Sequence, residues 1–117
     1  MTDPLDPLLG ALADPTRRRI LARLALGEAT VNDLTDALPI SQPAVSRHLR
    51  ILTEAGLVER SARAQQRPAR LVPGALKPVE DWAMSLRDTY ETRFAQLDRV
   101  LAAMPDDPDA DTPDTET

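Results

Sequence analysis

Apolar residues recur along this chain at helical spacing, between residues that begin or end helices. A short apolar stretch occupies Leu8–Leu12. Asp14 and Pro15 follow as a helix N-cap and a proline at the first helical position, and Gly27 stops that helix. Its apolar face consists of Ile20, Leu21 and Leu24. The pattern predicts a short first helix and a capped second one.

The next two apolar stretches also begin with capping residues. Thr30 and Asp33 have the spacing of a capping box and open a short helix, which Pro39 ends. Ser41 then caps a longer helix. Its apolar positions stand at i, i+4 and i+7 and form one stripe: Val45, Leu49 and Leu52. We therefore expect two helices in close succession, the second with one face turned inward.

Two β-like runs come after these helices, at Leu57–Arg60 and Ala69–Val72. The stretch between them is polar and basic, and it contains Arg63 and Arg67. This pattern predicts a β-hairpin with an exposed, arginine-bearing loop. The predicted order of four helices, two strands and a last helix describes a mainly α fold with a small β-hairpin wing, a winged helix-turn-helix.

The last helix is expected from Leu76 to Met104, where apolar residues recur every three or four positions as one continuous seam. A helix of about 29 residues would run about 43 Å at 1.5 Å per residue. Because that length exceeds the width of so small a domain, we expect something outside the monomer's core to cover part of the seam.

Composition limits the chemistry that this chain can perform. A length of 117 residues suits one domain. The chain has no Cys and one His, which excludes disulfides, thiolate metal sites and thiol nucleophiles and leaves little for a His-based zinc site. No triad can be built around the single His48, and no glycine-rich phosphate loop is present, so we expect no enzyme activity and no cofactor.

The net charge of −5 is unevenly distributed. Residues 105–117 carry six acids and no base, and we expect them to form a disordered acidic tail. Residues 1–104, the expected folded domain, then hold 13 acids and 14 bases. The segment Ser41–Arg70 alone carries six Arg against two Glu. An overall acidic chain thus contains one basic segment, which covers the capped helix and the hairpin.

These basic and polar residues predict contacts with double-stranded DNA. If the apolar stripe faces inward, the opposite face of the capped helix carries Gln42, Ser46, Arg47 and Arg50. Gln can bind adenine and Arg can bind guanine in the major groove, so we assign Gln42, Ser46 and Arg47 to base edges. The phosphate and wing contacts that we expect are Thr30, Ser41, His48, Arg50, Arg63 and Arg67.

Plainer interpretations stand beside two of these assignments, and a basic run outside them can be considered with them. Ser41 can serve as a helix cap alone, and His48 can be a residue that is only oriented by a local hydrogen bond. The run Arg17–Arg19 is better explained as a solvated face with local ion pairs than as a DNA contact.

Four stretches together carry a family resemblance: LADPTRRRIL, the V-x-D-L that starts at Val31, SQPAVSRHLRIL and the AGLV turn. The chain resembles the ArsR/SmtB family of bacterial winged-helix repressors. The resemblance implies a cytoplasmic homodimer on a pseudo-palindromic operator, with the last helix at the interface. The dimerisation residues expected on that helix are Leu86, Tyr90, Phe94, Leu97 and Leu101.

The family's metal-binding residues have no counterparts in this chain. The stretch at Thr30–Leu34 lacks thiols, and the last helix carries acids without His. The chain therefore resembles a non-metal-sensing subgroup, released by an unidentified small-molecule inducer. The rival hypothesis is a protein-interaction module that uses the same scaffold and its long amphipathic helix, which the basic wing disfavours. No spanning segment or signal peptide is visible, and we expect no membrane partner.

Overall fold

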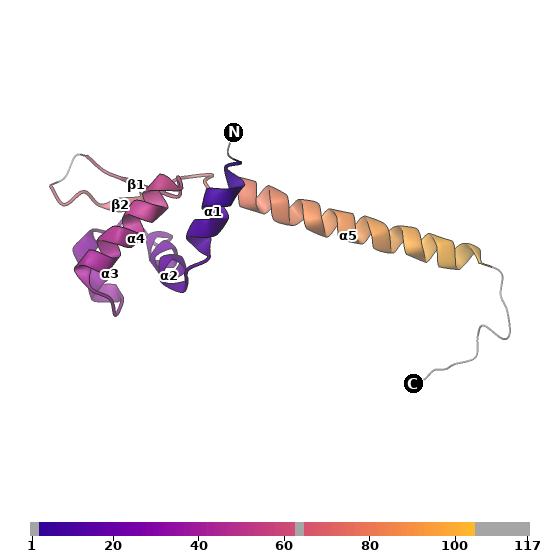
Figure 1. Cartoon of the computed structure of the whole chain (residues 1–117), viewed down its shortest axis with the longest axis horizontal. Helices are drawn as coiled ribbons and strands as arrows, with labels where there is room; N and C mark the ends of the chain where they lie inside the picture. Colours follow the sequence, from indigo (N-terminus) through magenta and orange to yellow (C-terminus); the bar gives the residue numbers. More distant parts are fainter. Residues whose placement is uncertain (1–2, 63–64, 105–117) are drawn as a thin grey trace. The chain divides into compact units, whose positions relative to one another are not determined.

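The computed structural model describes residues 3–62 and 65–104 (Figure 1). Its elements are α1 (Leu5–Leu12), α2 (Pro15–Leu24), α3 (Val31–Ala37), α4 (Gln42–Glu54), β1 (Val58–Arg60), β2 (Ala69–Leu71) and α5 (Lys77–Ala103). The predicted order of elements is confirmed. Arg63 and the expected acidic tail, residues 105–117, lie outside the described residues.

Helices α2 and α4 begin at the predicted capping side chains. Asp14 accepts a hydrogen bond of 2.9 Å from the backbone N–H of Arg17, and Ser41 accepts one of 3.3 Å from that of Ala44. Each helix has its proline in the first turn, where a missing N–H costs nothing. Helix α1 begins at Leu5, before Pro7, because a proline is equally tolerated in that first turn.

Helix α3 begins with the predicted capping box. The Thr30 hydroxyl accepts from the Asp33 N–H at 3.1 Å, and the Asp33 carboxylate accepts from the Thr30 N–H at 3.0 Å. Hydrogen bonding from Thr30 lowers the pKa of Asp33. The carboxylate therefore stays charged at a more acidic pH than usual, and this part of the capping is lost only as the pH falls through that lowered pKa.

Substitution Thr30→Ala removes one half of the capping box. We expect the free energy of unfolding to fall by about 1 kcal/mol, which lowers the melting temperature by about 4–8 °C in a domain of this size. Thermal melts followed by circular dichroism measure the change. Thr35→Ala is the matched control, because its hydroxyl only bonds back to the Val31 carbonyl within α3. Equal losses in both variants would contradict the capping role.

One apolar core lies within residues 3–81. The predicted stripe of α4 is confirmed, since Val45, Leu49 and Leu52 are each 0% exposed. Helix α3 packs against α4, and α4 packs against β1. The other buried residues are Leu8, Ala11, Ile20, Leu24, Ala29, Leu34, Leu57, Val58 and Ala69. This packing fixes α4 by one face and leaves its opposite face at the surface.

The hairpin is antiparallel, with Glu59 paired to Arg70 and Arg60 paired to Ala69. Each strand is one residue shorter than predicted. Leu57 instead donates its N–H to the carbonyl of Leu52 in α4, which links the hairpin to that helix. Val72 donates to the Leu57 carbonyl, so the two runs stay in contact beyond the ends of the strands. A bridge from Ala29 to Ala69 ties the hairpin to the segment before α3.

Helix α5 runs one residue short of its predicted bounds at each end, and none of its residues is buried. The five predicted dimerisation side chains on it are between 50% and 63% exposed: Leu86, Tyr90, Phe94, Leu97 and Leu101. The rings of Tyr90 and Phe94 meet edge to face at 4.9 Å. These apolar side chains are thus largely exposed in the structure of one chain.

Candidate nucleic-acid interface

The outer face of α4 presents the residues that the sequence assigned to DNA. Gln42, Ser46, Arg47 and Arg50 are all exposed. Neither arginine is held by an ion pair or side-chain hydrogen bond within the described part of the chain, so both guanidinium groups are available to a ligand. Forked donors beside a short hydroxyl and an amide suit the base edges of a major groove.

Two predicted phosphate contacts are helix caps. Thr30 and Ser41 each accept a backbone hydrogen bond at the start of α3 and α4, so the capping interpretation of Ser41 is confirmed. A hydroxyl that accepts in this way keeps its own proton for another acceptor. Both residues stand at helix N-termini, where the helix dipole favours an anion.

The wing contains a pair of arginines, of which the sequence indicated only one. The side-chain Nε of Arg60 donates to the backbone carbonyl of Arg67 at 2.8 Å. Arg67 has a φ of 51°, a left-handed conformation that is uncommon outside glycine. Burial is the main cause that lowers the pKa of Arg60, and the nearby charge of Arg67 lowers it further. Two guanidinium charges close together favour a phosphate, so Arg60 joins the candidate residues.

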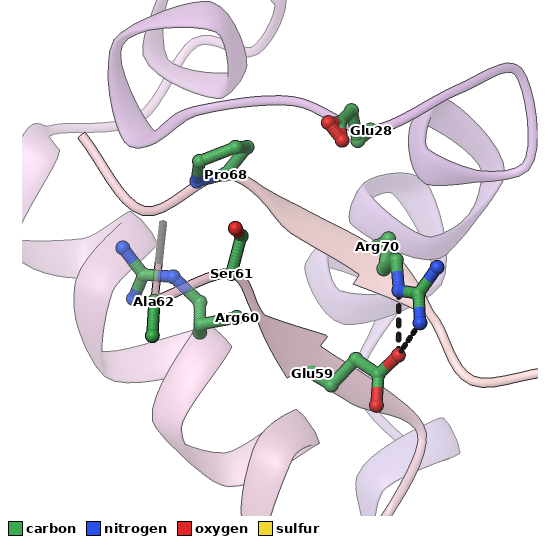
Figure 2. A pocket seen from close by; sticks show the side chains of 7 residues that line it. All are labelled: Glu28, Glu59, Arg60, Ser61, Ala62, Pro68 and Arg70. Atoms are coloured by element: carbon green, nitrogen blue, oxygen red, sulfur yellow. Dashed lines mark hydrogen bonds and ion pairs between the residues drawn. The ribbon is translucent and has the colours of Figure 1, made fainter. Parts of the chain in front are cut away.

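A charged hollow lies at the base of the wing, lined by Glu28, Glu59, Arg60, Ser61, Ala62, Pro68 and Arg70 (Figure 2). Arg70 forms an ion pair with Glu59, its partner across the hairpin, and the Arg60 guanidinium lies away from this pair. Arg70 is thus paired with an acid, whereas Arg60 has no acidic partner among the described residues. The basic segment offers fewer available cations than its composition suggests.

The arginines of α2 do not form the expected local ion pairs within the described residues. Arg17 donates instead to the carbonyls of Ala11 at 2.8 Å and Gly10 at 3.3 Å, and Arg18 donates to that of Leu12 at 2.6 Å. The ion-pair part of the prediction is wrong, because carbonyls near the C-terminal end of α1 accept from Arg17 and Arg18 instead. Arg18 and Arg19 are exposed, as expected for a solvated face.

The ring of His48 contacts another side chain, as the plainer interpretation of an oriented ring predicted, but the partner is Arg17 on α2 and not a residue nearby in the sequence. Its Nδ1 lies 3.3 Å from Nη1 of Arg17, and its side chain is half-buried.

No three His, Cys, Asp or Glu side chains within residues 3–62 and 65–104 gather closely enough to hold a metal ion. No helix in the same ranges is long and apolar enough to cross a bilayer.

Comparisons with known proteins identify the family. The model of the arsR family of bacterial regulatory proteins matches residues 14–60. The HTH-type transcriptional regulator Rv2034 of Mycobacterium tuberculosis is 47% identical over 92 residues, which cover 74% of this chain and 81% of that protein. The chain belongs to the arsR family. It is a DNA-binding transcriptional regulator with a winged helix-turn-helix fold, as predicted.

Other similar proteins support this assignment. The repressor SmtB of Mycobacterium tuberculosis is 48% identical over 63 residues, 52% of this chain and 47% of that protein. An ArsR-like regulator from Rhodococcus sp. RHA1 superposes with a TM-score of 0.77 at 25% identity, covering 87% of this chain and 94% of its own. A Mycobacterium bovis winged helix-turn-helix domain, described as homodimeric, gives a TM-score of 0.60 at 26% identity. The match covers 74% of this chain and 80% of that domain. The relatives are named as regulators and not as enzymes.

Proposed function

We propose that this arsR-family regulator is a cytoplasmic, homodimeric repressor that binds a pseudo-palindromic operator. The observation that carries the proposal is the outer face of α4, which is polar, basic and unpaired, while its inner face is wholly buried. Two such helices in a symmetric dimer would enter successive major grooves about one helical turn apart.

The candidate side chains fall into two groups, those that contact DNA bases and those that contact DNA phosphates. Gln42, Ser46 and Arg47, towards the start of α4, read base edges. The phosphate contacts are Arg50 and His48 on α4, the caps Thr30 and Ser41, and the wing arginines Arg60, Arg63 and Arg67. Arg60 is added to the sequence-based set because it lies beside Arg67.

The dimer forms through α5. The exposed apolar seam supports this, because a helix with no buried residue needs a partner surface. The homodimeric Mycobacterium bovis neighbour supports a second copy as that partner. The seam residues are Leu86, Tyr90, Phe94, Leu97 and Leu101.

The inducing signal that we propose is a small molecule rather than a metal ion. Zinc, nickel and copper prefer thiolate and imidazole ligands, and this chain has no Cys and a single His. That His already has Arg17 as a neighbour. The acidic tail, residues 105–117, would disfavour non-specific DNA by charge repulsion.

Salt dependence of DNA binding tests the function. If each dimer engages about eight phosphates, log K should fall against log salt concentration with a slope near −7. Fluorescence anisotropy with a labelled promoter fragment of the protein's own gene, from about 50 to 200 mM salt, measures the slope. A scrambled fragment of equal length is the control. No preference for the promoter over the scrambled DNA at any salt concentration would favour the protein-interaction module instead.

A further inference from the structure

One side chain joins three elements of the DNA-binding unit. Arg17, on α2, donates through Nε to the Ala11 carbonyl and through Nη2 to the Gly10 carbonyl, both at the end of α1. Its third group, Nη1, lies 3.3 Å from Nδ1 of His48 on α4. The guanidinium fork thus has a partner on each side, and the side chain is half-buried. Such a group is occupied within the protein and is poorly placed to bind DNA itself.

The contact determines which nitrogen of His48 carries the proton. A guanidinium only donates, so Nδ1 must accept and the neutral imidazole must hold its proton on Nε2. No residue in the described part of the chain accepts from Nε2. His48 precedes Leu49, which is fully buried, and follows Arg47, which is exposed, so the ring stands at the border between core and surface.

Asp14 lies near Arg17 and His48. Its carboxylate accepts the backbone N–H of Arg17, which is the main cause of its lowered pKa, and the charges of Arg17 and His48 lower that pKa further. Arg17 and the N-cap Asp14 therefore place one cation and one anion near His48, both at the start of α2.

We propose that Arg17 is a positioning residue for DNA binding, which links the end of α1 to His48 and fixes the imidazole so that Nε2–H is donated to a DNA phosphate. The inference rests on the proposed function, because it assumes that α4 meets DNA. Arg17 acts only through His48 and touches no phosphate.

The first experiment needs no DNA. His48 is the only histidine, so a long-range ¹H–¹⁵N spectrum of the full chain shows one imidazole. At about pH 8, where an ordinary imidazole is neutral, we expect Nε2 protonated and Nδ1 shifted by an accepted hydrogen bond. Arg17→Gln should abolish that shift. Arg18→Gln is the matched control, since Arg18 bonds to the end of α1 without touching His48. A proton on Nδ1, or a spectrum unchanged by Arg17→Gln, would overturn the proposal.

The second experiment measures coupling on DNA. Arg17→Gln should weaken promoter binding about fivefold to tenfold and leave the salt slope unchanged. In a His48→Ala background the same change should have no further effect. Additive losses, or a slope shallower by about two for the dimer, would instead indicate direct phosphate contact by Arg17.

If Arg17→Gln does not fold, the variants His48→Asn and His48→Gln test the same proposal. The Asn side chain places an acceptor near the position of Nδ1, whereas the Gln side chain places a donor near that of Nε2. We expect His48→Gln to keep more of the promoter affinity than His48→Asn, and the reverse order would contradict the role of Nε2–H. If the wild-type protein binds no DNA specifically, the proposed function fails, while the spectrum still decides whether Arg17 fixes the ring.

Discussion

Arg47→Ala is expected to weaken operator binding by about 1–3 kcal/mol, roughly 5- to 150-fold in Kd, and to relax base preference at one position of each half-site. Arg47 lies on the exposed face of α4, has no partner within the described residues, and follows the buried Val45 by two positions. Its guanidinium is therefore free to bind guanine O6 and N7. Selection of binding sites from random DNA, with wild type and variant in parallel, measures both effects.

Arg50→Ala is the matched control for this prediction. It removes the same charge one turn further along α4, at a residue assigned to phosphate. Its loss should be equal for operator and random DNA, and the selected sequences should not change. If Arg47→Ala also weakens operator and random DNA equally, Arg47 reads no base.

Phe94→Glu is expected to convert the dimer to a monomer. Phe94 lies in the centre of the uncovered seam, where it meets Tyr90 edge to face. A carboxylate there would be desolvated against an apolar partner surface, and burial of an unpaired charge is strongly unfavourable. Loss of a central aromatic group typically costs 2–4 kcal/mol, roughly 30- to 1,000-fold in dimer dissociation. Sedimentation equilibrium measures the change, and operator affinity should fall with it.

Thr92→Glu is the control for the seam. It adds the same charge on the same helix, but Thr92 is two residues from Phe94 and therefore on the opposite side of α5. It should remain dimeric. If the Phe94→Glu variant remains dimeric, or if Thr92→Glu also dissociates the dimer, the seam is not the dimer interface.

The helices and their caps could be predicted because their causes are local. Asp14, Thr30 and Ser41 each cap a helix that starts at the next residue, and the apolar stripe of α4 follows from spacing alone. The outer face of α4 then follows as the remainder of the helix. The strand ends were less well predicted, since they depend on which neighbour takes each backbone group.

The contacts that modify the candidate site could not be predicted, because they join residues far apart in the chain. Arg17 and His48 are 31 positions apart and meet only once α2 and α4 have packed. The pairing of Glu59 with Arg70 depends on the register of the hairpin. Arg60 contacts Arg67 because the hairpin backbone turns at Arg67, whose φ is positive. Glycine is the usual residue in that conformation, and its absence here meant that the turn could not be predicted. The composition gives no way to distinguish these arginines. The fold shows which of them are paired with other protein groups and which have no protein partner and can bind a ligand.

The absence of any buried residue along α5 has a consequence for regulation in the cell. If the helix is sheltered only by a second molecule, operator-competent protein accumulates as the square of monomer concentration when the protein is scarce. Promoter silencing would then set in over a narrow range of expression levels. A gene that the protein controls would respond to modest changes in synthesis or degradation of the regulator itself, without any inducer.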